Sequence, residues 1–286
     1  MADYRAIARD ERDILGEGPT WSAADGALYW VDIKGRKVWR YGLDDEAVTR
    51  WAMPEPIGWL VEREARPGFI AGFQSGIAAL TLEPLAITPL ITPEPELPGN
   101  RMNDAKVDPH GRLWAGTMDD RETEDRGSLY RLDPDLTLTR HDGGYRVTNG
   151  PAFSPDGTVL YHTDSARRTV FRFDLTAGER LENKQPLITF EDSWGYPDGM
   201  TTDAEGGLWI AHWGGGRVSR FTPDGEFDRS IALPASQITS CAFAGEGLDR
   251  MFVTSASRGQ PDEPDAGRLF EIEPGIRGLA PTPFAG

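Results

Sequence analysis

One unit recurs six times along this 286-residue chain and limits what it can fold into. Each copy has an apolar run, a turn that contains glycine, and a second apolar run. The turn glycines stand at positions 26, 68, 111, 157, 206 and 247, so the copies begin 41 to 49 residues apart. Apolar runs on both sides of such a turn predict two antiparallel strands joined as a hairpin. After each hairpin comes a turn and a further strand, as in Gly127–Leu132.

Four strands in every 45 residues or so are typical of a β-propeller. We therefore predict an all-β fold, a six-bladed β-propeller with four-stranded antiparallel blades around a central channel, as one domain over residues 1–286. Outer strands are expected at residues 47–52 and 227–233, and residues 4–15 should add a strand to the last blade and close the ring. A β-sandwich with accidental self-similarity is the alternative.

Composition excludes several classes of function. The formal net charge of −16 repels phosphate backbones and anionic lipids, so we expect neither nucleic acid nor a membrane as a partner. Cys241 is the single cysteine, which rules out an intrachain disulfide and predicts a small buried side chain rather than a nucleophile. Because the N-terminus is polar and no apolar run reaches membrane-spanning length, we expect a cytoplasmic protein, either a monomer or a weak homodimer.

The first strand of each propeller blade lines the channel, so equivalent positions of the six repeats should meet near the axis. Counting back eight or nine residues from each turn glycine gives a predicted ring of Glu17, Trp59, Asn103, Asn149, Asp198 and Thr239. Carboxylate and carboxamide oxygens, which four of these residues carry, are ligands for divalent cations. Two close carboxylates repel each other unless a cation lies between them. A metal site is favoured over a network of hydrogen bonds with channel water.

Five motifs occur in the same order as in a known family and span nearly the whole chain. They are Leu15-Gly16-Glu17-Gly18-Pro19, Asn103-Asp104-Ala105-Lys106-Val107-Asp108, Gly111-Arg112-Leu113-Trp114-Ala115-Gly116-Thr117-Met118, Thr148-Asn149-Gly150-Pro151 and Tyr196-Pro197-Asp198-Gly199. With them the sequence resembles the SMP-30/gluconolactonase/regucalcin family. The resemblance implies a six-bladed propeller and a metal-dependent sugar lactonase, similar to the bacterial aldonolactonases.

The resemblance also implies roles for individual residues. Glu17, Asn149 and Asp198 match the metal ligands, and Asp198 also matches the proposed general base. The positions that match substrate contacts are Arg101, Asn103 and, next to them, Asp104. Family members have a further substrate-contacting glutamate shortly after the Thr-Met pair. Arg121 stands where the animal members have that glutamate, so Glu122 or Asp120 would take its place here.

The function predicted on this basis is hydrolysis of a sugar lactone, an aldono-1,4- or 1,5-lactone, to the aldonic acid. One divalent metal ion (Ca²⁺, Zn²⁺, Mn²⁺, Mg²⁺ or Fe²⁺) would be the cofactor, and a small sugar lactone the substrate. Three alternatives remain open: a promiscuous esterase or organophosphate hydrolase, a non-catalytic cation-binding regulatory protein, and a protein-interaction propeller. The last is disfavoured because the predicted channel mouth is acidic rather than apolar.

Overall fold

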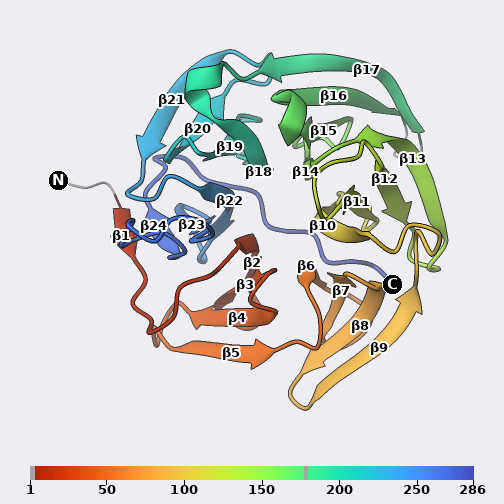
Figure 1. Ribbon diagram of the computed structural model, residues 1–286, viewed down its shortest axis with the longest axis horizontal. Coiled ribbons are helices and arrows are strands. Elements are labelled where there is room, and N and C mark those ends of the chain that lie inside the picture. The colour runs from red at the N-terminus through yellow and green to blue at the C-terminus, as the bar shows by residue number, and fades with distance from the viewer. Residues whose placement is uncertain (1–3, 177–179) are drawn as a thin grey trace.

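The repeated hairpins form six blades around a central channel in the computed structural model, which describes residues 4–176 and 180–286 (Figure 1). Within these residues the strands form six sheets of four, and every strand pair is antiparallel. The predicted fold class is therefore confirmed. Residues 1–3, which belong to the polar N-terminus considered above, lie outside the described residues.

The blades share one order of strands from the channel outward. The inner strands are β2 (Gly16–Ser22), β6 (Ile57–Glu62), β10 (Asn100–Val107), β14 (Thr148–Phe153), β18 (Tyr196–Thr202) and β22 (Ile238–Ala244). The second strands are β3 (Ala27–Asp32), β7 (Phe69–Phe73), β11 (Leu113–Asp119), β15 (Val159–Asp164), β19 (Leu208–Trp213) and β23 (Arg250–Ser255). The third strands are β4 (Lys37–Gly42), β8 (Gly76–Leu82), β12 (Gly127–Leu132), β16 (Thr169–Thr176), β20 (Arg217–Phe221) and β24 (Phe270–Ile272). The outer strands are β5 (Val48–Ala52), β9 (Leu85–Ile91), β13 (Leu138–Tyr145), β17 (Arg180–Thr189), β21 (Phe227–Ala232) and β1 (Tyr4–Ala6).

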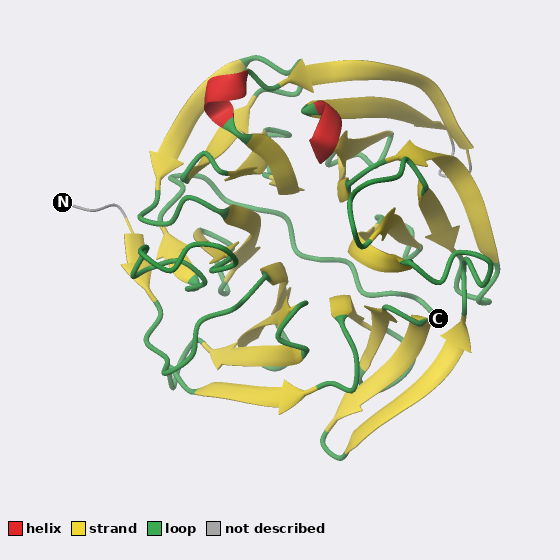
Figure 2. Ribbon diagram, viewed as in Figure 1, coloured by secondary structure: helices red, strands yellow, loops and turns green. Residues whose placement is uncertain are grey.

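The first strand of the chain completes the last blade. β1 pairs with β24, with Tyr4 opposite Ile272, so the predicted closure of the ring is confirmed. The two predicted outer strands are present as β5 and β21. The described part of the chain also has two short 3₁₀ turns, η1 (Ser165–Arg167) and η2 (Asp192–Trp194) (Figure 2). None of its helices has the length and apolar character needed to cross a membrane.

Buried aspartates stabilise several of the hairpin turns. Asp203 Oδ1 accepts a hydrogen bond from the backbone N–H of Gly207 at 2.9 Å, and its Oδ2 accepts from Trp209 Nε1 at 2.9 Å and Arg220 Nε at 2.7 Å. In the same way, Asp108 Oδ2 accepts a hydrogen bond from Trp114 Nε1 at 2.9 Å. Since each carboxylate has several donors, its burial is compensated and the turn is tied to the strand that follows.

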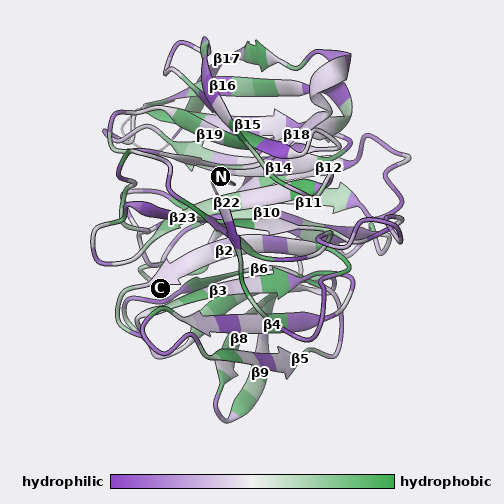
Figure 3. Cartoon of the chain, turned by 90° about the vertical axis from the view of Figure 1, so that its left-hand side faces the viewer, coloured by the Kyte–Doolittle hydropathy of each residue, from purple (hydrophilic) through white to green (hydrophobic). Residues whose placement is uncertain are grey.

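The apolar core lies between neighbouring blades. Tyr29 of the first blade meets Phe69 of the second edge to face, with 5.0 Å between ring centroids. Trp209 and Phe243 make a similar contact between the fifth and sixth blades, at 6.4 Å. In the edge-on view, hydrophobic segments gather along the stacked strands, while hydrophilic segments are frequent in the loops (Figure 3). Packing between blades thus fixes the inner strands relative to one another.

The inner strands all change register against the second strand at one level of the channel. The shifts fall between Glu17 and Thr20, Ile57 and Trp59, Met102 and Ala105, Asn149 and Ala152, Pro197 and Met200, and Ile238 and Ser240. A β-bulge bends the strand and redirects the side chains beside it. These bulges coincide with the predicted ring of polar residues.

Residues 273–286, here called the strap, cross the channel at the end where the inner strands finish (Figure 1). The strap is bonded to the sixth and fifth blades through Gly278 N–H to Leu248 O at 2.7 Å and through Ala204 N–H to Arg277 O at 2.9 Å. At its far end Phe284 is fully buried between the second and third blades. The strap therefore joins opposite sides of the ring, which the repeats did not predict.

Candidate active site at the mouth of the channel

Six predicted site residues are buried together where the inner strands begin. They come from the first, third, fourth and fifth blades, and each is between 3% and 8% exposed. We call this group the mouth site: Glu17 of β2, Arg101, Asn103 and Asp104 of β10, Asn149 of β14, and Asp198 of β18. Polar side chains of this kind are seldom buried without partners, so their contacts define what the site can bind.

A chain of hydrogen bonds fixes the carboxamide of Asn149. Its Nδ2 donates to Ser165 Oγ at 2.8 Å, and Ser165 Oγ in turn donates to Pro197 O at 2.6 Å. The Asn149 Oδ1 accepts from Asn103 Nδ2 at 3.0 Å. Because a carbonyl oxygen has two lone pairs, Asn149 Oδ1 keeps one for a further partner in the channel.

The three carboxylates of the mouth site destabilise one another when ionised. Burial, then the charges of Asp198 and Asp104, raises the pKa of Glu17 well above its usual range. Burial, then the charge of Asp104, does the same to the pKa of Asp198. Burial raises the pKa of Asp104 to about 6. The charge of Arg101 opposes the shifts of Glu17 and Asp198 but does not cancel them.

A divalent cation fits this donor set. The Asp104 carboxylate already has two hydrogen-bond donors, since it accepts from the backbone N–H groups of Ala105 at 2.7 Å and Gly150 at 3.0 Å. Among the described residues, the Glu17 carboxylate accepts a hydrogen bond only from the N–H of Gly18, at 3.1 Å. A cation between Glu17 and Asp198 would relieve their repulsion, and oxygen ligands suit hard divalent ions. Among the described residues no group of three or more His, Cys, Asp or Glu side chains is arranged to hold a metal; the predicted set has two carboxylates and one carboxamide.

Arg101 is held rigidly at the edge of the mouth site. Its Nη1 donates to Asn103 Oδ1 at 2.5 Å and Met102 O at 3.1 Å, and its Nε donates to Asp120 Oδ1 at 2.6 Å. Asp120 Oδ1 also accepts from Lys34 Nζ at 2.6 Å. The guanidinium is therefore oriented before any ligand arrives, which is how arginine recognises oxygen-rich ligands.

Glu122 lies on the loop of residues 120–126, which connects β11 to β12. Its side chain is exposed and its φ is 60°, in the left-handed region that non-glycine residues adopt infrequently. The charge of Glu122 contributes to the raised pKa of Asp198, so it acts on the mouth site from the loop. Asp120, the other residue considered for this place, is committed to Arg101 and Lys34.

Two members of the predicted ring have other surroundings. Trp59 follows the bulge of β6, whereas the other ring members precede or lie within the bulges of their strands, and it packs in the core between the second and third blades. Thr239 donates from Oγ1 to Gly16 O at 2.5 Å, which ties the sixth blade to the first. Cys241 is buried, and burial raises the pKa of its thiol to about 12, in agreement with the expected inert side chain.

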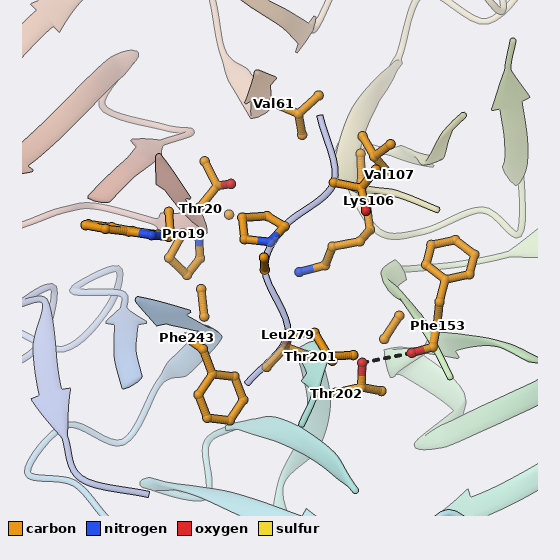
Figure 4. Close-up of a pocket in the computed structure, with 18 of the residues that line it drawn as sticks. Pro19, Thr20, Val61, Lys106, Val107, Phe153, Thr201, Thr202, Phe243 and Leu279 are labelled. Atoms are coloured by element: carbon orange, nitrogen blue, oxygen red, sulfur yellow. Dashed lines mark hydrogen bonds between the residues drawn. The ribbon is translucent and has the colours of Figure 1, made fainter. Parts of the chain in front are cut away.

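A cavity of about 280 Å³ lies below the mouth site, between the far halves of the inner strands and the strap (Figure 4). We call it the base cavity. Lys106 extends into it, and Leu279 of the strap lies across it (Figure 4). Asp104 lines the base cavity, and its charge also acts on Glu17 and Asp198, so this residue borders both regions. The base cavity was not predicted from the sequence.

Lys34 and Ser165, which bond to Asp120 and Asn149, were also not predicted from the sequence. Ser165 directly follows β15, and Lys34 stands in the turn between β3 and β4. Both positions lie in connections from a second to a third strand, on the same face of the propeller as the mouth site. Position on that face is the signal that could have identified them.

Comparisons with known proteins agree with the fold and the motifs. Residues 15–257 match the family described as SMP-30/Gluconolactonase/LRE-like region. An L-arabinolactonase of Azospirillum brasilense is 38% identical over 100% of this chain and 97% of its own length. A regucalcin of Xenopus laevis is 36% identical over 95% of each chain. The crystal structure of a calcium-binding protein, regucalcin, from Agrobacterium tumefaciens is 30% identical, covers 99% of this chain and 97% of its own, and superposes with a TM-score of 0.93.

Proposed function

Because the chain belongs to the SMP-30/gluconolactonase/LRE-like family, we propose that it hydrolyses a sugar lactone, an aldono-1,4- or 1,5-lactone, to the aldonic acid with one divalent metal ion. The observation that carries the proposal is the mouth site, where two buried carboxylates with raised pKa values, a fixed carboxamide and a pre-oriented arginine lie together. The similarity to a protein named L-arabinolactonase supports the choice of substrate class.

Glu17, Asn149 and Asp198 would hold the ion, which could be Ca²⁺, Zn²⁺, Mn²⁺, Mg²⁺ or Fe²⁺. When bound, the ion would polarise the lactone carbonyl and offset the negative charge that develops on its oxygen. A neutral third ligand matters here, because a third carboxylate would neutralise the ion further and weaken this polarisation. Asn149 is suited to that place because its amide N–H is already bonded to Ser165.

The other residues bind and orient the reactants. Arg101 and Asn103 would contact the sugar hydroxyls, and Arg101 Nη2 makes no hydrogen bond with the described residues and is free to donate. Asp198 would orient the attacking water and accept its proton. The water oxygen bonds to the carbonyl carbon, the ring C–O bond breaks, and the departing oxygen takes a proton to become a hydroxyl.

The test is a panel of initial rates on metal-replete protein in a pH-stat, with xylono-, arabinono- and gluconolactone beside a phosphotriester. We expect at least one lactone to be hydrolysed with kcat/KM on the order of 10⁴ M⁻¹s⁻¹ or more, far above the phosphotriester. Metal binding without acceleration over spontaneous ring opening would instead indicate a non-catalytic cation-binding protein. Faster turnover of the phosphotriester would indicate a different hydrolase.

A further inference from the structure

Three side chains from two non-adjacent blades meet beside the mouth site. Lys34 comes from the first blade, and Arg101 and Asp120 come from the third, with the second blade between them. One atom, Asp120 Oδ1, accepts hydrogen bonds from both Lys34 Nζ and Arg101 Nε, each at 2.6 Å. This contact, here called the clasp, therefore spans the second blade.

The clasp is more than an exposed ion pair. The side chains of Lys34, Asp120 and Arg101 are 23%, 30% and 5% exposed. Burial opposes ionisation of Asp120, but its hydrogen bonds with Lys34 and Arg101 outweigh that cost and hold its pKa below the usual range. Charge-assisted hydrogen bonds with limited water access are stronger and better oriented than surface pairs.

Both ends of the clasp rest on rigid backbone. The turn that carries Lys34 is held by Asp32, which is fully buried and accepts the N–H of Gly35 at 2.8 Å. On the other side, Asp120 N–H donates to Gly99 O at 3.0 Å. A lysine ammonium on a fixed turn can therefore set where the Asp120 carboxylate lies.

Asp120 is also the first residue of the loop of residues 120–126. The residues that follow Asp120 in this loop form a tight turn. Asp119 Oδ2 accepts from the N–H of Thr123 at 3.1 Å and of Glu124 at 3.2 Å. The turn places Glu122, the substrate-contact residue that the family resemblance implies, two positions after Asp120 of the clasp. Lys34 is thus connected through one carboxylate to the guanidinium of Arg101 and to the first residue of the loop that carries Glu122.

We propose that Lys34 is a positioning residue for substrate binding, which holds Asp120 so that Arg101 and Glu122 are arranged to receive the sugar hydroxyls. The inference rests on the proposed lactonase function. Sugar hydroxyls away from the carbonyl change little during the reaction, so contacts with them stabilise the bound substrate and the transition state equally. Loss of the clasp should therefore raise KM and leave kcat nearly unchanged.

The experiment compares Lys34→Met, Lys34→Arg and Lys37→Met with the wild-type protein. Lys37 is a matched control, because it is 22% exposed and pairs with Glu11 at 2.5 Å away from the mouth site. For Lys34→Met we expect KM to rise about tenfold with kcat within about twofold. Lys34→Arg keeps the charge and should return KM to within about threefold of wild type, and Lys37→Met should match the wild type.

A second readout needs no substrate. Hydrogen–deuterium exchange of residues 120–126 in the ligand-free protein should be faster in Lys34→Met than in the wild type or Lys37→Met, because the loop loses an anchor. Unchanged exchange would overturn the proposal even if the wild-type protein hydrolysed no lactone, an outcome that would separately contradict the proposed function. An active wild type whose KM is unaffected by Lys34→Met, or equally affected by Lys37→Met, would also overturn it.

Discussion

Replacing Asp198 with alanine is expected to lower kcat for lactone hydrolysis about 10²–10⁴-fold at saturating metal. The carboxylate is the one group of the mouth site assigned both to the ion and to the attacking water. Steady-state rates at several metal concentrations separate the two roles, because a loss that persists at saturation cannot be due to weak metal binding. Near-normal turnover in this variant would contradict the assignment of Asp198.

The same substitution should not destabilise the metal-free protein. Asp198 is buried beside Asp104 and Glu17, and its raised pKa means that the folded protein disfavours its ionised form. The metal-free variant should therefore melt at the same temperature as the wild type at neutral pH, or higher. Asp192→Ala is the control, since Asp192 is 92% exposed and outside the mouth site, and it should leave kcat unchanged. A lower melting temperature for Asp198→Ala would point to a structural role.

Replacing Phe284 with alanine is expected to lower the free energy of unfolding by about 3–5 kcal/mol. Phe284 is fully buried in the core cluster that contains Trp59, Val107 and Leu113, so its removal leaves a cavity between the second and third blades. It also anchors the end of the strap, whose backbone bonds with Glu62 and Glu64, each 2.8 Å long, depend on its position. Urea-induced unfolding followed by tryptophan fluorescence measures the loss.

Leu279→Ala provides the matched control for the strap. Leu279 lies in the same segment but is 39% exposed, so we expect a change of less than about 0.5 kcal/mol. Equal and small losses in the two variants would show that the strap is not needed for stability. A large loss confined to Phe284→Ala would show that the buried end of the strap contributes to stability, whereas the exposed part around Leu279 does not.

The blades could be predicted because their turns impose a local requirement that repeats. Five of the six turn glycines used to count the repeats, such as Gly157 with φ of 68°, have the positive φ that favours glycine. In the sixth turn Gly245, with φ of 87°, has this role instead of Gly247. Turn glycines and alternating apolar residues are both short-range signals, so they can be recognised in the sequence.

The ring of polar residues was only partly predictable, because a bulge changes the count along a strand. The register shift of β2 spans Glu17 to Thr20, whereas that of β6 spans only Ile57 to Trp59. Counting nine residues back from the turn therefore crossed the bulge and reached the polar position in β2, but it stopped at Trp59 before crossing the bulge in β6. The number of residues in a bulge depends on packing at the channel, which spacing alone does not reveal.

Contacts between non-repeating segments could not be predicted. The clasp joins Lys34 to Asp120 across 86 positions of the sequence, and the strap reaches blades that were formed early in the chain. Neither has a counterpart in the other repeats, so self-similarity carries no information about them. Such contacts depend on the three-dimensional arrangement of turns on one face and of the chain end on the other.

The mouth site is proposed to hold one divalent ion that lactone hydrolysis requires. The most direct test removes metal from the wild-type protein with EDTA, restores single divalent metals by titration, and records bound metal and lactone turnover on the same samples. We predict that turnover is lost on removal and returns in proportion to bound metal, levelling off at about one ion per chain. Full turnover in metal-free protein would contradict this role of the metal. So would protein that binds the metals but recovers turnover with none of the five ions.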